Sequence, residues 1–493
     1  MKGENGERLS VIINSINLCF MLSSHDDDNN FNHETIRRNS RLEKTKKDEI
    51  FTLLPPDFDR YLAQLASNDP NLVTEAIFTF SRHYLYNRFE YNDNTHQIII
   101  AAKNFISESQ IQPLVNASFM FLSHIVQRPL NGLGFLLQLD FLDIFLTHLT
   151  NIKSPYFYLS LLSVKCVVGQ SPQVCEIVYK KIELKLLVDI ILNHPSNLNL
   201  DIHWLIFCIL YYMIIYVELI SEENIHNIVI ACSFALNQNY SNIHAKRISI
   251  RIIEKLFYKS ATYHETEYAS SFMNMFNYLL SLNTGPVSQT NKEKQKTIEN
   301  NCQIISSVLI AYLPLLELGT ATKENGIDII KVIQLLSVVH NHIQINALDC
   351  IRYFIRAKPE KISFLIQNQL ILKLHLIFER FSFNAKEKAL EIVSLIMTYG
   401  NENDKSFLLN PFYTVTVVNL AKEGKKQVFL ECINILNAMF MAEESSGRDL
   451  GIRSSFLEVD GVLLIDENTG SDDEQVAEAT LQFFNFHFNK DDV

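Results

Sequence analysis

A repeated spacing of about 42 residues constrains the fold of this chain more than any other feature of its sequence. Aligned helix ends place His124, Cys166 and Cys208 at equivalent positions, with successive separations of 42 residues. The equivalent position recurs at Phe354 and Ser394, which are 40 residues apart. Between these positions, apolar residues recur at helical spacing in segments separated by short polar breaks. The spacing therefore predicts a chain built from helical repeats.

The length of one repeat and the composition of the chain narrow the fold class further. Armadillo and HEAT repeats run ~40–47 residues, with two or three helices each. The 493 residues include only 14 glycines and 12 prolines. Both counts lie below the usual ~7% and ~5%, which favours long helices with short connections. We expect an all-α, armadillo-repeat, right-handed superhelical solenoid over residues 57–489, with about ten repeats. The segments IVQRPLNG, VVGQSPQ, IRAKPEK and IMTYGNEN are each expected to end one helix and open the next.

One polar stretch interrupts the repeat phase. Cys208 and Phe354 are 146 residues apart, which is three periods of 42 residues and 20 further residues. Residues 283–301 form a polar run of 19 residues without apolar periodicity, close to this excess. We therefore predict a loop inserted in the array near residues 283–301, with the same repeat phase on both sides.

The charge and the motifs of the chain exclude several functional classes. A net charge of −12 makes the chain a poor ligand for nucleic-acid phosphates and suits basic partners better. None of the GxGxxG, P-loop, HExxH or GxSxG patterns occurs, and the histidines are scattered. The eight cysteines are dispersed without a CxxC pair, as expected for reduced, buried thiols. We expect a protein that binds other proteins, that is not an enzyme, and that uses no metal or cofactor.

Two apolar stretches are too short to predict a membrane span. Ser10 to Leu22 resembles the core of a signal peptide, but the polar residues HDDDNN follow and no small-residue cleavage site is evident. Trp204 to Ile220 falls short of the ~20 residues that a spanning helix needs. A buried helix of the solenoid accounts for the second stretch, so we expect no membrane partner.

Three stretches of the sequence resemble one known family. SNDPNLVTEAIFTFSRHYL, from Ser67 to Leu85, has an SxDPNL opening and resembles the first repeat of the importin-alpha family of armadillo-repeat adaptors. GQSPQVCEIVYKKIELKLLVDIIL, from Gly169, is similar to the junction after the third repeat. FLEVDGVLLIDENTGSDDEQVAEATLQFFNFHF, from Phe456, is similar to the acidic last repeat, and QVFLECINIL, from Gln427, resembles the helix before it. The resemblance covers nearly the whole chain and is weakest in the fifth and sixth repeats.

This resemblance implies a function in nuclear import. It implies a protein that shuttles between cytoplasm and nucleus and joins an importin-beta-type carrier to cargo with nuclear localisation signals. It also implies an export carrier as a partner of the C-terminal repeats. The alternative, from a different functional class, is an armadillo scaffold that assembles another complex and has no transport activity.

A basic segment lies ahead of the repeats, in IRRNSRLEKTKKDEI. Its six basic residues fall within eleven positions: Arg37, Arg38, Arg41, Lys44, Lys46 and Lys47. Clustered cations bind carboxylates strongly only when several act together. The segment resembles the importin-beta-binding arm of the family, to which we assign residues 33–54. A nuclear localisation signal or a solvated charge run is the alternative. Residues 1–32 form an N-terminal extension without an assignment, which we expect to be disordered.

In the importin-alpha family, a groove along the innermost helices binds basic peptides through a Trp and, four residues later, an Asn. The Asn amides bind the peptide backbone, and the Trp rings attract lysine side chains. The corresponding pairs in this chain are Met120/His124, Leu162/Cys166, Trp204/Cys208, Cys350/Phe354 and Leu390/Ser394. Only Trp204, the single tryptophan of the chain, matches the family type, and we find no paired Asn. We therefore expect cargo with basic signals to bind weakly or in an atypical way. The alternative for Trp204 is a core aromatic.

Overall fold

The computed structural model describes residues 55–86, 92–126, 140–193, 200–237, 242–259, 267–284, 292–319, 321 and 326–488. These residues form 24 α-helices and one 3₁₀-helix, and they contain no β-strand. The prediction of an all-α repeat solenoid is therefore confirmed. The N-terminal extension and the basic arm, residues 1–54, lie outside the described residues.

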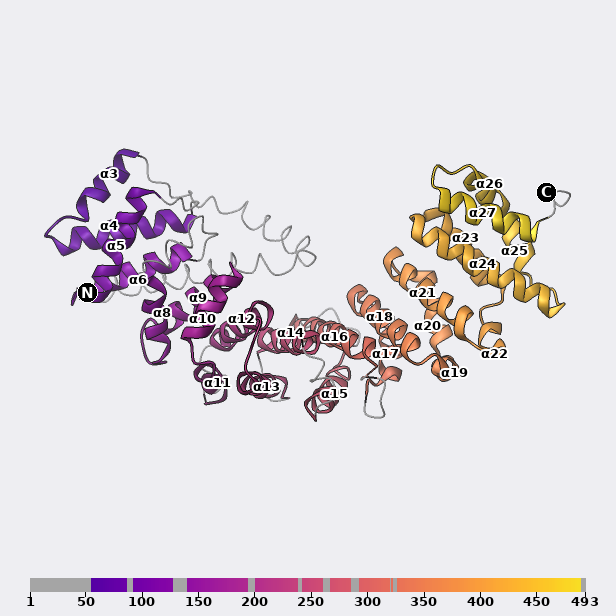
Figure 1. Cartoon of the computed structure of the whole chain (residues 1–493), viewed down its shortest axis with the longest axis horizontal. Coiled ribbons are helices and arrows are strands. Elements are labelled where there is room, and N and C mark those ends of the chain that lie inside the picture. Colours follow the sequence, from indigo (N-terminus) through magenta and orange to yellow (C-terminus); the bar gives the residue numbers. More distant parts are fainter. Residues whose placement is uncertain are drawn as a thin grey trace. The chain divides into compact units, whose positions relative to one another are not determined.

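The chain divides into two compact units, Met1–Ala231 and Cys232–Val493, and Figure 1 shows the helices in chain order within each. The described helices of unit 1 are α3 (Pro55–Gln64), α4 (Pro70–Tyr86), α5 (Asp93–Glu108), α6 (Gln112–Val126), α8 (Phe141–Leu149), α9 (Phe157–Val168), α10 (Pro172–Lys181), α11 (Leu184–Asn193) and α12 (Leu200–Tyr216). The boundary falls within α13 (Glu222–Leu236). The described helices of unit 2 are α14 (Ile243–Lys259), α15 (Glu267–Leu279), α16 (Lys292–Glu317), α17 (Ile329–Leu335), α18 (Asn341–Ala357), η3 (Pro359–Lys361), α19 (Ile362–Gln367), α20 (Leu370–Arg380), α21 (Phe383–Tyr399), α22 (Glu402–Ser406), α23 (Pro411–Glu423), α24 (Lys426–Ser446), α25 (Ile452–Glu458), α26 (Gly461–Thr469) and α27 (Glu474–His487).

The complete repeats contain three helices. In unit 2, one repeat consists of α22, α23 and α24, and the next consists of α25, α26 and α27. Within each unit, the last helix of one repeat packs against the last helix of the next, and we call these the stacking helices. Among the described residues they are α4, α6, α9 and α12 in unit 1, and α14, α16, α18, α21, α24 and α27 in unit 2. Each repeat thus buries its apolar side against its neighbours, as expected for a solenoid.

The repeat period appears directly in the hydrogen bonds between stacking helices. Ser163 Oγ lies 2.8 Å from Ser123 Oγ, 40 residues earlier in the chain. Cys350 Sγ lies 3.2 Å from the carbonyl oxygen of Leu309, 41 residues earlier. A residue therefore contacts the residue about one period away, because neighbouring repeats superpose when they stack.

Local sequence explains where the helices end. α9 ends at Val168 and α10 begins at Pro172, within VVGQSPQ, because proline at the first helical position loses no hydrogen bond there. α21 ends at Tyr399, and the side chain of Asn401 then caps α22 by accepting a hydrogen bond from the backbone N–H of Asp404. IRAKPEK ends α18 in the same manner and opens η3. These three predicted boundaries are confirmed, and the fourth, IVQRPLNG, runs beyond the described residues.

The loop predicted near residues 283–301 is wrong for its second half. Residues 292–301 form the first turns of α16. Lys, Glu and Gln dominate the start of this helix, and they are strong helix formers. The side chains of residues 294–297 are exposed, so no packing contact imposes an apolar period on them. Hydrophobic periodicity detects helices that bury one face, and for this reason it misses this segment.

An aromatic cluster closes the last repeat. The Phe440 ring of α24 lies 5.3 Å from the Phe456 ring of α25 and 5.4 Å from the Phe483 ring of α27, measured between centroids. His487 is buried beside them, with Nε2 2.6 Å from Oδ1 of Asn437. Burial lowers the pKa of His487. The folded last repeat therefore favours a neutral imidazole at this position.

The apolar stretch that begins at Trp204 lies largely in α12. This helix packs against α9 and α10, as a helix of the repeat array. No helix among the described residues is long and apolar enough to cross a bilayer.

Candidate functional site

One stacking helix of unit 2, α14, keeps a side that its neighbours do not cover. In α14, exposed or half-buried side chains recur every three or four positions: His244, Arg247, Arg251, Lys255 and Tyr258. Residues at this spacing share one face of a helix. We call this face, taken over the stacking helices of one unit, the exposed row of that unit. A partner lying along it would contact several repeats.

The six residues predicted to line a groove do not share one environment. Three of them are half-buried: Met120, Cys166 and Trp204. The other three, which are no more than 5% exposed, are His124, Leu162 and Cys208. The structure therefore leaves only the first three within reach of a partner.

His124 was predicted to face the groove, but its side chain lies on the packed side of α6. Its Nδ1 lies 2.8 Å from Oγ of Ser81 on α4, so the ring joins two repeats. Three further aligned positions are also buried: Cys350, Phe354 and Leu390. A helix turns by about 100° per residue, so an alignment displaced by one residue exchanges the exposed row for the packed side.

Trp204 already contacts a cation that belongs to the chain. Nζ of Lys165 on α9 lies 5.7 Å from the centroid of the Trp204 ring on α12. Lys165 is only 5% exposed, so its aliphatic stem is buried. A cation at this distance from an indole face is attracted by the ring quadrupole. Trp204 is therefore neither a fully buried core aromatic nor an empty slot for a partner's lysine.

The exposed row of unit 2 contains a network of charges between α18 and α21. Arg352 forms ion pairs with Asp349 on its own helix, at 2.9 Å, and with Glu391 on α21. Lys388 lies 3.0 Å from Glu391 and 3.5 Å from Asp349. Burial acts to raise the pKa of Glu391, but hydrogen bonds from Arg352 and Lys388 outweigh it and lower the pKa. The network therefore holds Glu391 ionised.

Glu431, a second carboxylate of this row, has fewer favourable contacts to offset its burial. Burial raises the pKa of Glu431 on α24, and repulsion from Glu391 and Glu387 adds to the rise. A hydrogen bond from Ser394 and the charge of Arg356 act in the opposite direction without cancelling it. Glu387 and Glu391 of α21 thus both repel Glu431 of α24, and an added cation beside Glu431 would offset this repulsion.

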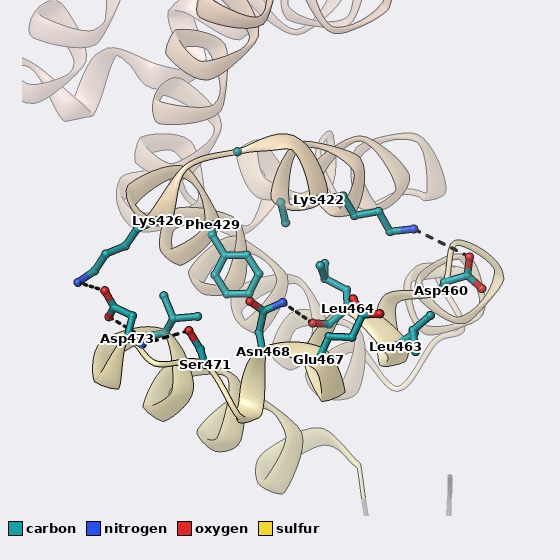
Figure 2. A pocket seen from close by; sticks show the side chains of 13 residues that line it. Lys422, Lys426, Phe429, Asp460, Leu463, Leu464, Glu467, Asn468, Ser471 and Asp473 are labelled. Carbon is teal, nitrogen blue, oxygen red and sulfur yellow. Dashed lines mark hydrogen bonds and ion pairs between the residues drawn. The ribbon is translucent and has the colours of Figure 1, made fainter.

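A cavity of ≈ 590 Å³ opens near the α23–α24 and α26–α27 turns of the last two repeats (Figure 2). Lys426 Nζ lies 2.7 Å from Asp473 Oδ2 at one side, and Lys422 Nζ lies 4.0 Å from Asp460 Oδ2 at the other. The hydrogen bond from Lys426 lowers the pKa of Asp473. Figure 2 shows the ring of Phe429 between the two ion pairs. The lining contains no histidine and no cysteine. It combines lysine and aspartate side chains with apolar ones, a mixture that suits contact with another protein.

Two exposed asparagines escaped the sequence alignment. Asn434 follows the half-buried Leu430 by four positions on α24, within QVFLECINIL. The i, i+4 spacing alone identifies this pair once the helix phase is known. Asn116 precedes Met120 by four positions on α6, and its Oδ1 accepts a hydrogen bond from the Tyr156 hydroxyl at 2.5 Å. The expected pattern places the asparagine four residues after its partner, whereas Asn116 comes four residues before Met120, so the pattern could not identify it.

The remaining predicted site residues lie outside the described part of the chain. They are the basic residues of the arm: Arg37, Arg38, Arg41, Lys44, Lys46 and Lys47. Within the described ranges, no group of three or more His, Cys, Asp or Glu side chains is arranged to hold a metal ion.

Comparison with known proteins agrees with the fold. No family model and no curated protein sequence matches the chain. Among solved structures, an engineered protein matches 87% of this chain and 98% of its own length, with a TM-score of 0.59 and 12% identity. Two designed armadillo repeat proteins, one of them in complex with the peptide (KR)4, each match 52% of this chain at 13% and 14% identity, with TM-scores of 0.39 and 0.37. They match over 97% and 98% of their own lengths. At 12% identity, the likeness to the engineered protein is one of fold alone.

Proposed function

We propose that this chain is a nuclear import adaptor, which binds protein cargo along its exposed rows and an importin-beta-type carrier through its basic arm. The observation that carries the proposal is the succession of stacking helices, each packed against the next along its unit. Such a surface suits an extended partner segment that contacts several repeats at once. The adaptor would shuttle between cytoplasm and nucleus.

The exposed row of unit 2 supports cargo with basic residues. Glu431 lies near Glu387 and Glu391, and a partner's lysine or arginine beside it would reduce their mutual repulsion. Exposed ion pairs contribute only ~0–1 kcal/mol each and are screened by salt. Cargo binding therefore requires contacts with several repeats, and a single short basic signal would bind weakly.

The basic arm supports the carrier as a partner. Six basic residues within Arg37–Lys47 can bind a carboxylate-rich surface when they act together. A segment that becomes helical only on binding loses conformational entropy at that step, which reduces its net affinity. The cavity of the last two repeats, beside Lys422 and Lys426, supports a further partner such as an export carrier at the C-terminal end.

A pull-down with importin-beta tests the carrier part of this proposal. The full chain is compared with a chain that begins at Leu54, which keeps all described helices and lacks the arm. We expect the full chain to be retained and the truncated chain to be lost. Circular dichroism of the truncated chain controls for folding. Equal retention of both chains, or retention of neither, would contradict carrier binding through the arm.

A scaffold without transport activity is the second candidate. The contact between Lys165 and Trp204 favours it, because an aromatic ring that already holds an internal cation is poorly placed to bind a basic signal. The two candidates separate in the same pull-down. A scaffold is not retained by importin-beta, and its folded full chain is instead recovered with other partners by crosslinking in cells.

A further inference from the structure

Three stacking helices of unit 1, α6, α9 and α12, carry far fewer charged residues than α18, α21 and α24 of unit 2. Lys165 is the only lysine or arginine in α6, α9 and α12. These three helices contain a single acidic residue, Asp201, in the first turn of α12. Lys165 forms no ion pair among the described residues, so its charge is not offset there. The Lys165 ammonium instead faces the uncharged ring of Trp204, with Nζ 5.7 Å from the ring centroid.

We propose that Lys165 is a built-in cation that occupies the face of Trp204 and makes this part of the exposed row discriminate against partners that present lysine or arginine. The inference rests on the proposed function in one respect, namely that partners bind along the exposed rows. It adds the kind of partner side chain that can bind to unit 1 near Trp204. Its segment of the partner is apolar or acidic, and basic residues of the partner are directed elsewhere.

Competition for the ring explains the discrimination. Lys165 and Trp204 are held on two packed helices, so the lysine meets the ring at an effective concentration on the order of millimolar or higher. A partner's lysine offers the same type of attraction from a much lower concentration. Because Lys165 is 5% exposed, its stem is already desolvated, and displacing it would require unpacking it from the α9–α12 contact. Lys165 therefore keeps its place at the Trp204 ring in competition with a partner's lysine.

Electrostatic repulsion acts in the same direction. A second cation brought to the ring would lie within a few ångströms of Lys165, where like charges repel even in a partly hydrated setting. Acidic groups on a partner experience the opposite force. Met120 and Tyr211 are half-buried on the neighbouring helices and offer apolar contacts without charge. The surface is thus complementary to an apolar segment that carries carboxylates.

Charged quenchers of fluorescence test whether Lys165 sits at the ring. Trp204 is the only tryptophan in the chain, so its emission reports on this position alone. Quenching by caesium and by iodide is measured for the unmodified chain, Lys165→Met, which retains an apolar stem, and Lys165→Arg, which retains a cation. We expect Lys165→Met to raise the caesium-to-iodide ratio of quenching constants at least about twofold, and Lys165→Arg to leave it near the original value. Equal ratios in all three would overturn the proposal.

A basic peptide tests the discrimination itself. An octalysine peptide is titrated at physiological salt while Trp204 emission is followed. We expect Lys165→Met, or Lys165→Gln if the first variant folds poorly, to bind the peptide about tenfold more tightly than the unmodified chain. Calorimetry on the Lys165→Met/Trp204→Leu double variant should show that this gain is lost. Equal affinity of the unmodified chain and both lysine variants would contradict the proposal.

These measurements are independent of the proposed function. They use the isolated chain and a synthetic peptide, and neither importin-beta nor natural cargo is present. Failure of the full chain to bind importin-beta would therefore sink the adaptor while leaving the outcome at Lys165 intact. Failure of the quenching ratio to respond would sink the internal cation while leaving the adaptor open to its own test.

Discussion

Unit 1 and unit 2 join their repeats with different polar chemistry. In unit 1, the contacts between stacking helices include neutral groups, such as the pair Ser123 and Ser163 at 2.8 Å. Unit 2 also has neutral contacts, such as that of Cys350 with Leu309, but it adds a charged network in which Arg352 of α18 pairs with Glu391 of α21 and Lys388 takes part. Apolar packing stacks the repeats in both units. The polar contacts are therefore free to differ between the two units.

The difference also predicts where stability resides. Ion pairs taken partly out of water lose hydration, and their mutual attraction compensates only while both partners are present. A pair of hydroxyls loses less when one is removed. Unit 2 should therefore respond more strongly than unit 1 to the loss of a single polar side chain.

The largest effect is expected at Arg352. We expect Arg352→Ala to lower the free energy of unfolding by about 3 kcal/mol, near the lower limit for buried pairs, because the two side chains keep 15% and 19% exposure. Chemical denaturation followed by circular dichroism gives the value. The matched control is Arg356→Ala, one turn further on the same helix and exposed, where we expect a small change. Similar losses for both variants would remove the distinction between the network and an ordinary surface charge.

Acidification should act first on the neutral histidines of both units, and only at lower pH on the ion-pair network of unit 2. Burial lowers the pKa of His83 and His148 in unit 1 and of His487 in unit 2 below the usual 6.5. The stability linked to these groups is fully present above pH 6.5 and is lost as pH falls through their folded pKa values. Glu391 has a folded pKa below 4.5, so its contribution is present above 4.5 and is lost only at lower pH.

A thermal melt recorded at successive pH values checks this order. We expect a first loss of stability as pH falls from about 7 toward 5, followed by a second loss below about 4.5 that Arg352→Ala diminishes. His487→Phe should flatten part of the first loss. A melting temperature that does not change between pH 7 and pH 5 would show that the neutral histidines do not stabilise the fold.

A smaller effect is expected at the hydroxyl pair of unit 1. Ser163→Ala should cost about 1 kcal/mol, because it removes one buried hydrogen-bonding group and leaves Ser123 without that contact. Ser160→Ala is the matched control on the same helix, since Ser160 Oγ is buried and has no hydrogen-bond partner among the described residues. Denaturation should show little loss, or a slight gain, for the control. Equal losses would assign the effect to packing.

The smallest effect, and of opposite sign, is expected at Glu431. Its folded pKa is raised, so ionisation of this carboxyl above pH 4.5 costs folding free energy. Glu431→Gln keeps an acceptor for Ser394 and removes the charge, and we expect a melting temperature about 1–2 °C higher at pH 7. Near pH 4 the difference should vanish. A lower melting temperature at pH 7 would show that Glu431 is stabilised by a cation.

Sequence reasoning predicted the repeat fold well and the exposed row poorly. The 42-residue period was predictable because every repeat packs in the same way and therefore has apolar residues at the same positions. The ends of α9 and α21 were predictable from Pro172, which begins the next helix, and from Asn401, which caps the next helix. The exposed start of α16 buries nothing and left no such pattern. Which side of a stacking helix is open depends on a phase of one residue, and the contact of Lys165 with Trp204 depends on how two helices pack. Residue spacing along one helix predicts neither the open side nor the contact between two helices.

The central claim, that the chain is an adaptor docked on an import carrier by its basic arm, is tested most directly by titrating the full chain with importin-beta. Calorimetry at about 0.1 M and about 0.3 M salt compares the unmodified chain with the Arg41→Ala/Lys46→Ala/Lys47→Ala variant. The account predicts binding that weakens with salt, and a variant that binds at least about tenfold more weakly with a shallower salt dependence. An affinity that is unchanged in the variant at both salt concentrations would contradict it.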